Sequence, residues 1–116
     1  MKKLFFNIII GSLVVVPQMA FAQQTLEQAT DSIKQILVDA RAGKPEAQNE
    51  VGAWYYRGRH VKQNYKEAAQ WWAKAAAQGN ARAIGNLGLC YQTGNGVEAD
   101  SLKAMKLYTS SIKRGN

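Results

Sequence analysis

The sequence predicts an all-α protein, a short α-solenoid of antiparallel helix hairpins, and three observations lead to this prediction. Residues recur with a period of 36, so that Gly43, Gly79 and Gly115 stand one period apart. Between these glycines, apolar residues recur at intervals of three and four, the spacing of one face of an α-helix. Each period also has a glycine near its middle, where a helix would stop and a turn would begin. A repeat of two helices and a turn is typical of solenoids.

Two copies of the repeat, residues 44–79 and 80–116, agree at positions that hold glycines, aromatics and small residues. The identical pairs are Ala47 with Ala83, Gly52 with Gly88, Tyr55 with Tyr91, Gly58 with Gly94, Val61 with Val97, Ala68 with Ala104, and Gly79 with Gly115. Val51 with Leu87 and Trp72 with Tyr108 are conservative matches. Glycines and aromatics that recur at the same spacing are harder to attribute to coincidence than arbitrary identities.

In the first copy, local signals mark where the helices begin and end. Pro45 suits the first turn of a helix, where a backbone N–H has no intrahelical partner, and Gly58 ends that helix. Asn64 with Glu67 forms a capping-box-like start for the second helix. Gly79 stands where a left-handed glycine would close it.

The second copy repeats this order. A helix of about residues 81–92 is followed by the turn TGNGVEAD, and Asp100 caps a last helix that carries Leu102 and Leu107. The apolar face of Met105, Tyr108 and Ile112 would have no following repeat to cover it. We therefore expect either a more polar outer side or self-association through this helix.

One more helix, over residues 23–43, precedes the two copies. Its apolar residues at three-and-four spacing are Leu26, Ala29, Ile33, Leu37 and Ala40. Thr25 and Gln28 are candidates for its cap, and Gly43 closes it. In order along the chain it takes the place of the second helix of a preceding repeat.

Two glycines are predicted to lie inside helices. Gly52 and Gly88 each cost about 1 kcal/mol relative to alanine at such positions. Their recurrence one period apart suggests that another helix backbone passes close to each of them. The alternative is that both are tolerated accidents. Tyr55 and Trp72 would fill the wider space between the helices of the first hairpin.

The first 22 residues have the features of a secretory signal peptide. Lys2 and Lys3 precede an apolar run from Leu4 to Val16, and Ala20-Phe21-Ala22 is an A-x-A cleavage site. A run of this length gives about 20 Å of helix, too short for a hydrocarbon core of about 30 Å. We therefore expect cleavage after Ala22 rather than an uncleaved membrane helix. The product would be periplasmic or secreted, from a bacterium, and without a stable membrane anchor.

Composition narrows the class of partner. The whole chain has a net charge of +7, and loss of the two signal lysines leaves +5, which is mildly basic. The stretch WYYRGRHVKQNYKEAAQWW combines aromatic and basic residues as single-stranded nucleic-acid sites do, but export argues against a nucleic-acid partner. Cys90 is the one cysteine, so no disulfide can form within the chain.

These residues resemble the Sel1-like repeat, a relative of the tetratricopeptide repeat. The resemblance rests on a small residue, an aliphatic-Gly pair and a tyrosine, followed by a Gly-x-Gly-Val turn that Gly94, Gly96 and Val97 match in full. It implies a right-handed solenoid whose first helices line a concave groove. His60 departs from the pattern, standing where the turn's second glycine would be, and Ser110-Ser111-Ile112 replaces Lys-Ala-Ala. Some secreted members carry a disulfide in each repeat, which this chain cannot form.

No group of residues has the spacing of a catalytic or metal-binding site. A reactive or ligating His60 would need partners, and a solvent-facing turn histidine is the better interpretation. Cys90 is interpreted as a buried thiol, with a reactive thiol or an intermolecular disulfide as alternatives. The GNG stretch is a turn, because no strand precedes it to form a phosphate loop. We predict a protein that is not an enzyme and needs no cofactor and no metal.

The resemblance places candidate contacts with a protein or peptide in the groove. They are Asn49, Ala53, Tyr56 and Arg57 in the first copy and Gly85, Leu89, Gln92 and Thr93 in the second. Trp54 and His60 join them as residues that the fold does not obviously need. The predicted function is an exported adaptor that mediates protein–protein interaction in the cell envelope. The alternatives are a periplasmic immunity protein that neutralises a delivered toxin and, less favoured, a cell-wall-active or β-lactam-binding enzyme.

Overall fold

The structure, a computed structural model, describes residues 17–115, and over that range it contains helices and turns but no strand. The helices are α3 (Pro17–Arg41), α4 (Pro45–Arg57), α5 (Tyr65–Ala77), α6 (Ala81–Thr93) and α7 (Ser101–Gly115). The chain divides into two compact units, one ending at Lys34 and one starting at Gln35. The second unit, the helical body, holds the last turns of α3 and all of α4 to α7.

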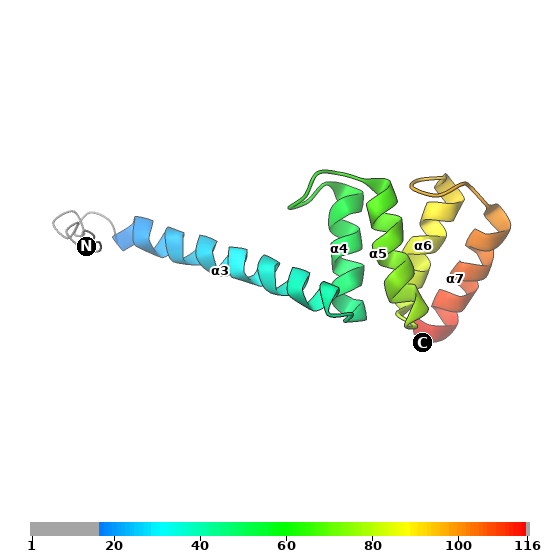
Figure 1. Cartoon of the computed structure of the whole chain (residues 1–116), viewed down its shortest axis with the longest axis horizontal. Coiled ribbons are helices and arrows are strands. Elements are labelled where there is room, and N and C mark those ends of the chain that lie inside the picture. Colours follow the sequence, from blue (N-terminus) through cyan, green and yellow to red (C-terminus); the bar gives the residue numbers. More distant parts are fainter. Residues whose placement is uncertain (1–16, 116) are drawn as a thin grey trace. The chain divides into compact units, whose positions relative to one another are not determined.

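Within the helical body, helices α4 to α7 run antiparallel and stack side by side in chain order. Helices α4 and α5 form one hairpin, α6 and α7 form the next, and α5 packs against α6 between them (Figure 1). This arrangement confirms the predicted all-α solenoid of helix hairpins.

The helix boundaries follow the predicted capping residues. Pro45 opens α4, Asn64 accepts a hydrogen bond from the backbone N–H of Glu67, and Asp100 does the same for Lys103 at the start of α7. At the other ends, Gly58 and Gly94 adopt left-handed φ angles of 72° and 77°. These local signals, which satisfy otherwise unpaired N–H and C=O groups, therefore place both turns at equivalent positions.

Small side chains and one large indole make up the centre of the helical body. The core cluster consists of Ala68, Ala69, Trp72, Ala75, Ala83 and Cys90. Five of its six members carry at most two side-chain heavy atoms, so the helix backbones can approach closely. Val97, from the turn of the second copy, packs against this cluster.

The helical glycines are needed for a different reason from the one that the sequence suggested. A Cβ atom on Gly52 would lie 2.5 Å from the indole of Trp72, and one on Gly88 would lie 3.1 Å from the ring of Tyr108. The prediction that a helix backbone passes each glycine was therefore wrong. An aromatic side chain of the hairpin's second helix occupies the space, which confirms Trp72 as a filler between the two helices.

The N-terminal helix starts earlier than predicted. Helix α3 runs without interruption from Pro17, so Thr25 lies inside it and does not mark its beginning. Gly43, with a φ of +100°, follows its end as expected. Residues 1–16 of the predicted signal peptide lie outside the described residues, and cleavage after Ala22 stays a prediction. Within residues 17–115, no helix is both long and apolar enough to cross a membrane.

A polar cluster ties the end of α3 to the first hairpin. The side-chain amide of Gln48, which is buried, donates to the carbonyl of Ala40. Gln78, just after α5, donates to the carbonyl of Gly43 and to Oε1 of Gln48, both at 2.9 Å. Because each buried polar group has a partner, the cluster fixes this junction without a desolvation penalty.

Candidate functional site

Two predicted groove residues of α4, Asn49 and Tyr56, form hydrogen bonds to residues of the second copy. Asn49 Oδ1 accepts a hydrogen bond from Asn86 at 3.0 Å. The hydroxyl of Tyr56 accepts one from Asn95, in the second copy's turn, also at 3.0 Å. Neither partner is itself a predicted contact, so the fold uses part of the hydrogen-bonding capacity of Asn49 and Tyr56.

Tyr56 belongs to an aromatic cluster rather than to a free surface. Its ring centroid lies 4.8 Å from that of Tyr65 and 5.3 Å from that of Trp72. Asn95 reaches the hydroxyl end of this cluster. The sequence signal for this role was the asparagine within the GNG turn, which faces back to the first copy.

Trp54 is the candidate contact that the structure argues against most clearly. Its side chain is only 4% exposed, so its indole is not available to a partner. The imidazole of His60 lies edge-on to it, with ring centroids 4.8 Å apart and an interplanar angle of 77°. His60 itself is exposed and has a left-handed φ of +66°.

The remaining groove residues differ in accessibility. Arg57 is exposed, whereas Ala53 and Leu89 are half-buried. Gln92 is exposed but its Oε1 accepts a hydrogen bond from the hydroxyl of Tyr108 at 2.6 Å. Of the candidates in the groove, Arg57 is therefore the one whose side chain is most available to a partner.

Near the start of α4 and α6 lies a hollow of about 430 Å³. Its lining residues are Glu46, Asn49, Glu50, Asn80, Ala81, Arg82 and Gly115. The charged groups here have both signs, so the hollow does not select a ligand of one charge. Asn49 is the predicted contact that lines it.

Cys90 lies fully buried in the core cluster, as predicted. Burial raises the pKa of its thiol to about 11, because a thiolate would lose its hydration there. A nucleophilic cysteine needs the opposite shift. In the part of the chain that the structure describes, no three His, Cys, Asp or Glu side chains are grouped to hold a metal ion.

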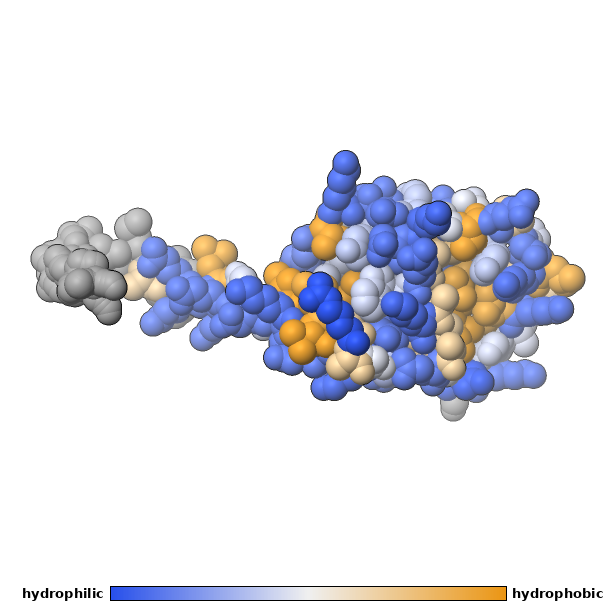
Figure 2. Space-filling view, in the orientation of Figure 1, coloured by the Kyte–Doolittle hydropathy of each residue, from blue (hydrophilic) through white to orange (hydrophobic). Residues whose placement is uncertain are grey.

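The outer face of α7 carries the most exposed large hydrophobic side chains that the structure describes in the helical body. Leu102, Met105 and Ile112 are 62%, 63% and 63% exposed, and they recur along one side of the helix. Figure 2 shows hydrophobic atoms interleaved with hydrophilic ones at this end of the body. We call these three residues the α7 stripe.

The prediction for this face needs one correction. Met105 and Ile112 are uncovered, but Tyr108 is half-buried and turns toward α6, where its ring lies against Gly88. Ser111 also points to α6 and donates to the carbonyl of Ala81 at 2.7 Å. Leu102, which the sequence reasoning did not assign to the face, replaces Tyr108 in the α7 stripe.

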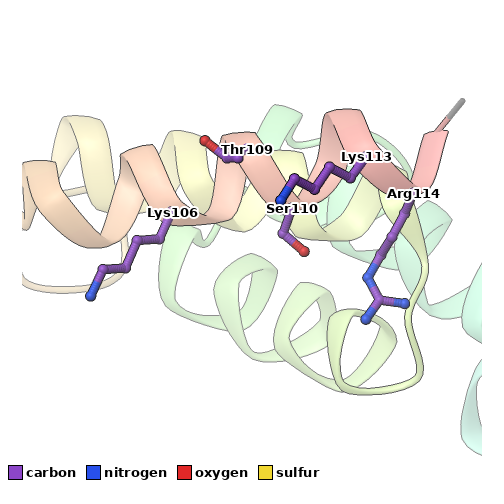
Figure 3. A pocket seen from close by; sticks show the side chains of 5 residues that line it. All are labelled: Lys106, Thr109, Ser110, Lys113 and Arg114. Carbon is purple, nitrogen blue, oxygen red and sulfur yellow. The ribbon is translucent and has the colours of Figure 1, made fainter.

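Beside the α7 stripe lies a basic surface. Lys106, Lys113 and Arg114, with Thr109 and Ser110 between them, line a hollow of about 420 Å³ along α7 (Figure 3). The guanidinium of Arg114 reaches the turn at Gly79. Lys103 is the fourth basic residue of α7, whose sequence has no acidic residue. The helix therefore presents hydrophobic contacts edged by positive charge.

The stacked hairpins and their matched turns define a helical-repeat protein. The Sel1 repeat model matches residues 45–80 and 81–116, and the chain belongs to the Sel1-repeat family. Proteins of this family are generally non-catalytic scaffolds, and their repeats generally mediate protein–protein interaction.

Solved structures agree with this assignment. A Sel1 repeat protein from Oxalobacter formigenes is 32% identical, with a TM-score of 0.69 over 72% of this chain and 63% of that one. A protective antigen present in uropathogenic Escherichia coli strains, which displays an SLR fold, is 34% identical, with a TM-score of 0.68 over 77% of this chain and 18% of that one.

One curated relative extends the comparison to animals. DAP3-binding cell death enhancer 1 of Rattus norvegicus is 30% identical over 100 residues, which is 86% of this chain. The chain spans 17% of that protein's length.

Proposed function

We propose that this protein is an exported, non-enzymatic adaptor that binds another protein in the bacterial cell envelope. The observation that carries the proposal is the α7 stripe, where three large hydrophobic side chains are each more than three-fifths exposed. Uncovered apolar side chains gathered on one helix, rimmed by polar groups, mark sites of protein interaction. The relative from rat, which is named for binding a protein, supports the same class of function.

Export rests on the amino-terminal sequence. A basic n-region, an apolar run and an A-x-A site within the first 22 residues are the features that direct secretion. Periplasmic and released locations both agree with this signal. Comparing the mass of the protein in envelope and medium fractions with the mass of residues 23–116 tests cleavage and location together.

Two uses of a binding surface fit an exported scaffold. An adaptor would join proteins of its own cell, whereas an immunity protein would bind a delivered toxin. Deletion of the gene followed by toxin challenge separates them, because only the immunity role predicts reduced survival. Self-association through α7 is a third use of the same face, and sedimentation over a range of concentrations measures it.

Co-purification from envelope extracts of the native host tests the proposal. Met105→Glu places a charge in the α7 stripe, and Leu26→Glu is the matched control, because Leu26 is 67% exposed in α3. We expect the wild type and Leu26→Glu to recover the same partner and Met105→Glu to lose it. Absence of any specific partner with the wild type would contradict protein binding.

The groove is tested in the same extracts by a second pair of variants. Arg57→Ala removes the most available groove side chain, and Lys66→Ala removes an exposed cation at the start of α5. Tyr56 is unsuitable for this purpose because its ring packs against Trp72 within the first copy and its hydroxyl accepts a hydrogen bond from the second copy. Loss of the partner with Arg57→Ala alone would move the binding surface from α7 to the groove.

A further inference from the structure

The internal repeat shows what covers the equivalent of the α7 stripe in the first copy. A shift of 36 residues relates Met105 to Ala69 and Ile112 to Ala76. Ala69 is buried in the core cluster, and Ala76 packs against that cluster. The cover comes from the second copy, whose α6 supplies Ala83 and Cys90 to the same cluster. Met105 and Ile112 thus stand where a following repeat's first helix would pack, whereas Leu102, whose equivalent Lys66 is exposed, lies at the edge of that place.

A second hollow, beside the α7 stripe, can be compared in the same way with the site that the second copy's turn fills on the first copy. It measures about 260 Å³ and is lined by Gln92, Ser101, Ala104, Met105 and Tyr108. Their first-copy equivalents are Tyr56, Tyr65, Ala68, Ala69 and Trp72. There, Asn95 bonds to the hydroxyl of Tyr56 and Gly96 lies against the carbonyl of Tyr65. The hollow therefore corresponds to the site on the first copy against which the turn of the second copy packs.

The second-copy segment that packs against the first copy indicates which residues a segment bound to the α7 face needs. A Cβ atom on Gly96 would collide with the backbone carbonyl of Tyr65, so the occupant needs a glycine at this turn position. Val97, the next residue, packs against the core cluster. The α6 residues within the cluster, Ala83 and Cys90, are small, and Leu87 of α6 packs against it from the same helix. An occupant of the α7 face would combine a helix with an apolar face that includes small residues and a Gly-aliphatic turn.

A second copy of this chain fits poorly in either arrangement. In a head-to-tail contact, His60 would take the position of Gly96, and its Cβ atom would meet the carbonyl of Ser101 in the same way. In a symmetric contact, two α7 helices would oppose each other, each with four basic residues and no acidic one. Like charges held at such close range repel.

From these relationships we infer that the α7 face binds the first helix and turn of a repeat of this same type carried by a different protein. The partner's segment has glycine where this chain has His60, and it is neutral or acidic, which suits Lys106 and Lys113 beside the α7 stripe. The inference rests on the proposed protein-binding function and names the segment that is bound.

A synthetic peptide of residues 80–100, with Cys90→Ala to remove the thiol, serves as the probe because this segment occupies the equivalent place against α5. The full chain is titrated with it while the methyl signals of Met105 and Ile112 are followed by NMR. We expect saturable shifts of both signals. Met105→Glu in the protein should weaken binding about tenfold or more, because a buried methionine contributes at least that factor.

Two controls separate the inferred contact from general stickiness. Leu26→Glu in the protein should leave the affinity for the peptide unchanged. A peptide with Gly96→Ala should bind about tenfold more weakly, because its added methyl group meets the carbonyl of Ser101. Raising the salt concentration should also weaken binding, since the peptide has one arginine against Glu98 and Asp100.

The inference is overturned by the absence of saturable shifts at Met105 and Ile112, or by equal affinities of the glycine and alanine peptides. Sedimentation that shows the wild-type chain dimerising through Met105 would also overturn it. If the peptide fails while partner recovery from extracts still depends on Met105, the protein-binding function stands and the identity of the bound segment is wrong.

Discussion

The indole of Trp72 lies directly over Gly52, and its Nε1 donates a hydrogen bond to the carbonyl of Asn49 at 3.0 Å. One aromatic side chain thereby joins the two helices of the first hairpin by packing and by a polar contact. The second hairpin keeps the packing part of this relationship, with Tyr108 against Gly88.

Gly52→Ala should destabilise the protein although alanine favours helices. Alanine gains about 1 kcal/mol in helix propensity, but its Cβ atom would lie 2.5 Å from the indole of Trp72. Overpacking of this kind costs about 1–3 kcal/mol, and Trp72 cannot move without losing its hydrogen bond. We expect a lower free energy of unfolding in urea. Gly88→Ala should cost less, and a smaller loss at Gly52 than at Gly88 would contradict this explanation.

His60→Ala should lower stability by about 1 kcal/mol, whereas His60→Gly should be close to neutral. Alanine keeps the left-handed backbone, which costs about 1–2 kcal/mol outside glycine, and it loses the edge-on contact with Trp54, worth about 0.5–1.5 kcal/mol. Glycine loses the contact but relieves the strain. Thermal unfolding measures both, and equal losses in the two variants would show that backbone strain at residue 60 is unimportant.

The hydrogen bond between Tyr56 and Asn95 should couple the two copies. Tyr56→Phe removes the hydroxyl that accepts from Asn95 and keeps the aromatic cluster, so we expect a loss of about 1 kcal/mol. Asn95→Ala should cost a similar amount. The double variant should cost clearly less than the two single losses together, and strict additivity would show that the bond contributes nothing.

The pH dependence of stability should contain a contribution from Cys90. Burial raises its pKa from 9.0 to about 11, so between these values the unfolded chain loses the thiol proton while the folded chain keeps it. Stability from this group is complete below pH 9 and falls as the pH rises through 11. Urea unfolding at pH 8 and pH 10.5 should show a smaller decline for Cys90→Ala than for the wild type. Equal declines would contradict the shift.

Features set by backbone groups close in the sequence were predictable, and features set by which side chains meet in the folded hairpins were not. Gly58, Asn64 and Asp100 act on backbone groups within a few residues, so their roles follow from local chemistry. The roles of Trp54 and Tyr56 depend on His60 and Asn95. Which side chains these residues meet is fixed only when the hairpins fold and stack, and the periodic pattern contains no information on it.

The exposed face of α7 was likewise only partly predictable from the sequence. The repeat pattern led us to expect an exposed apolar face on the last helix, and Met105 and Ile112 are exposed there. It grouped Tyr108 with them because all three recur at helical spacing. The rotation of α7 about its own axis, which decides whether a side chain faces α6 or solvent, does not follow from that spacing. That rotation is visible only in the packing of Tyr108 against Gly88.

Site-specific photo-crosslinking in the native host tests the central claim, protein binding through the α7 face, most directly. A photoreactive amino acid replaces Met105 in one strain and Leu26 in a matched strain, because both side chains are exposed to a similar degree. The account predicts an adduct to a different polypeptide from position 105 and none of the same mass from position 26. The absence of an adduct at position 105, or a homodimer as its sole product, would contradict it.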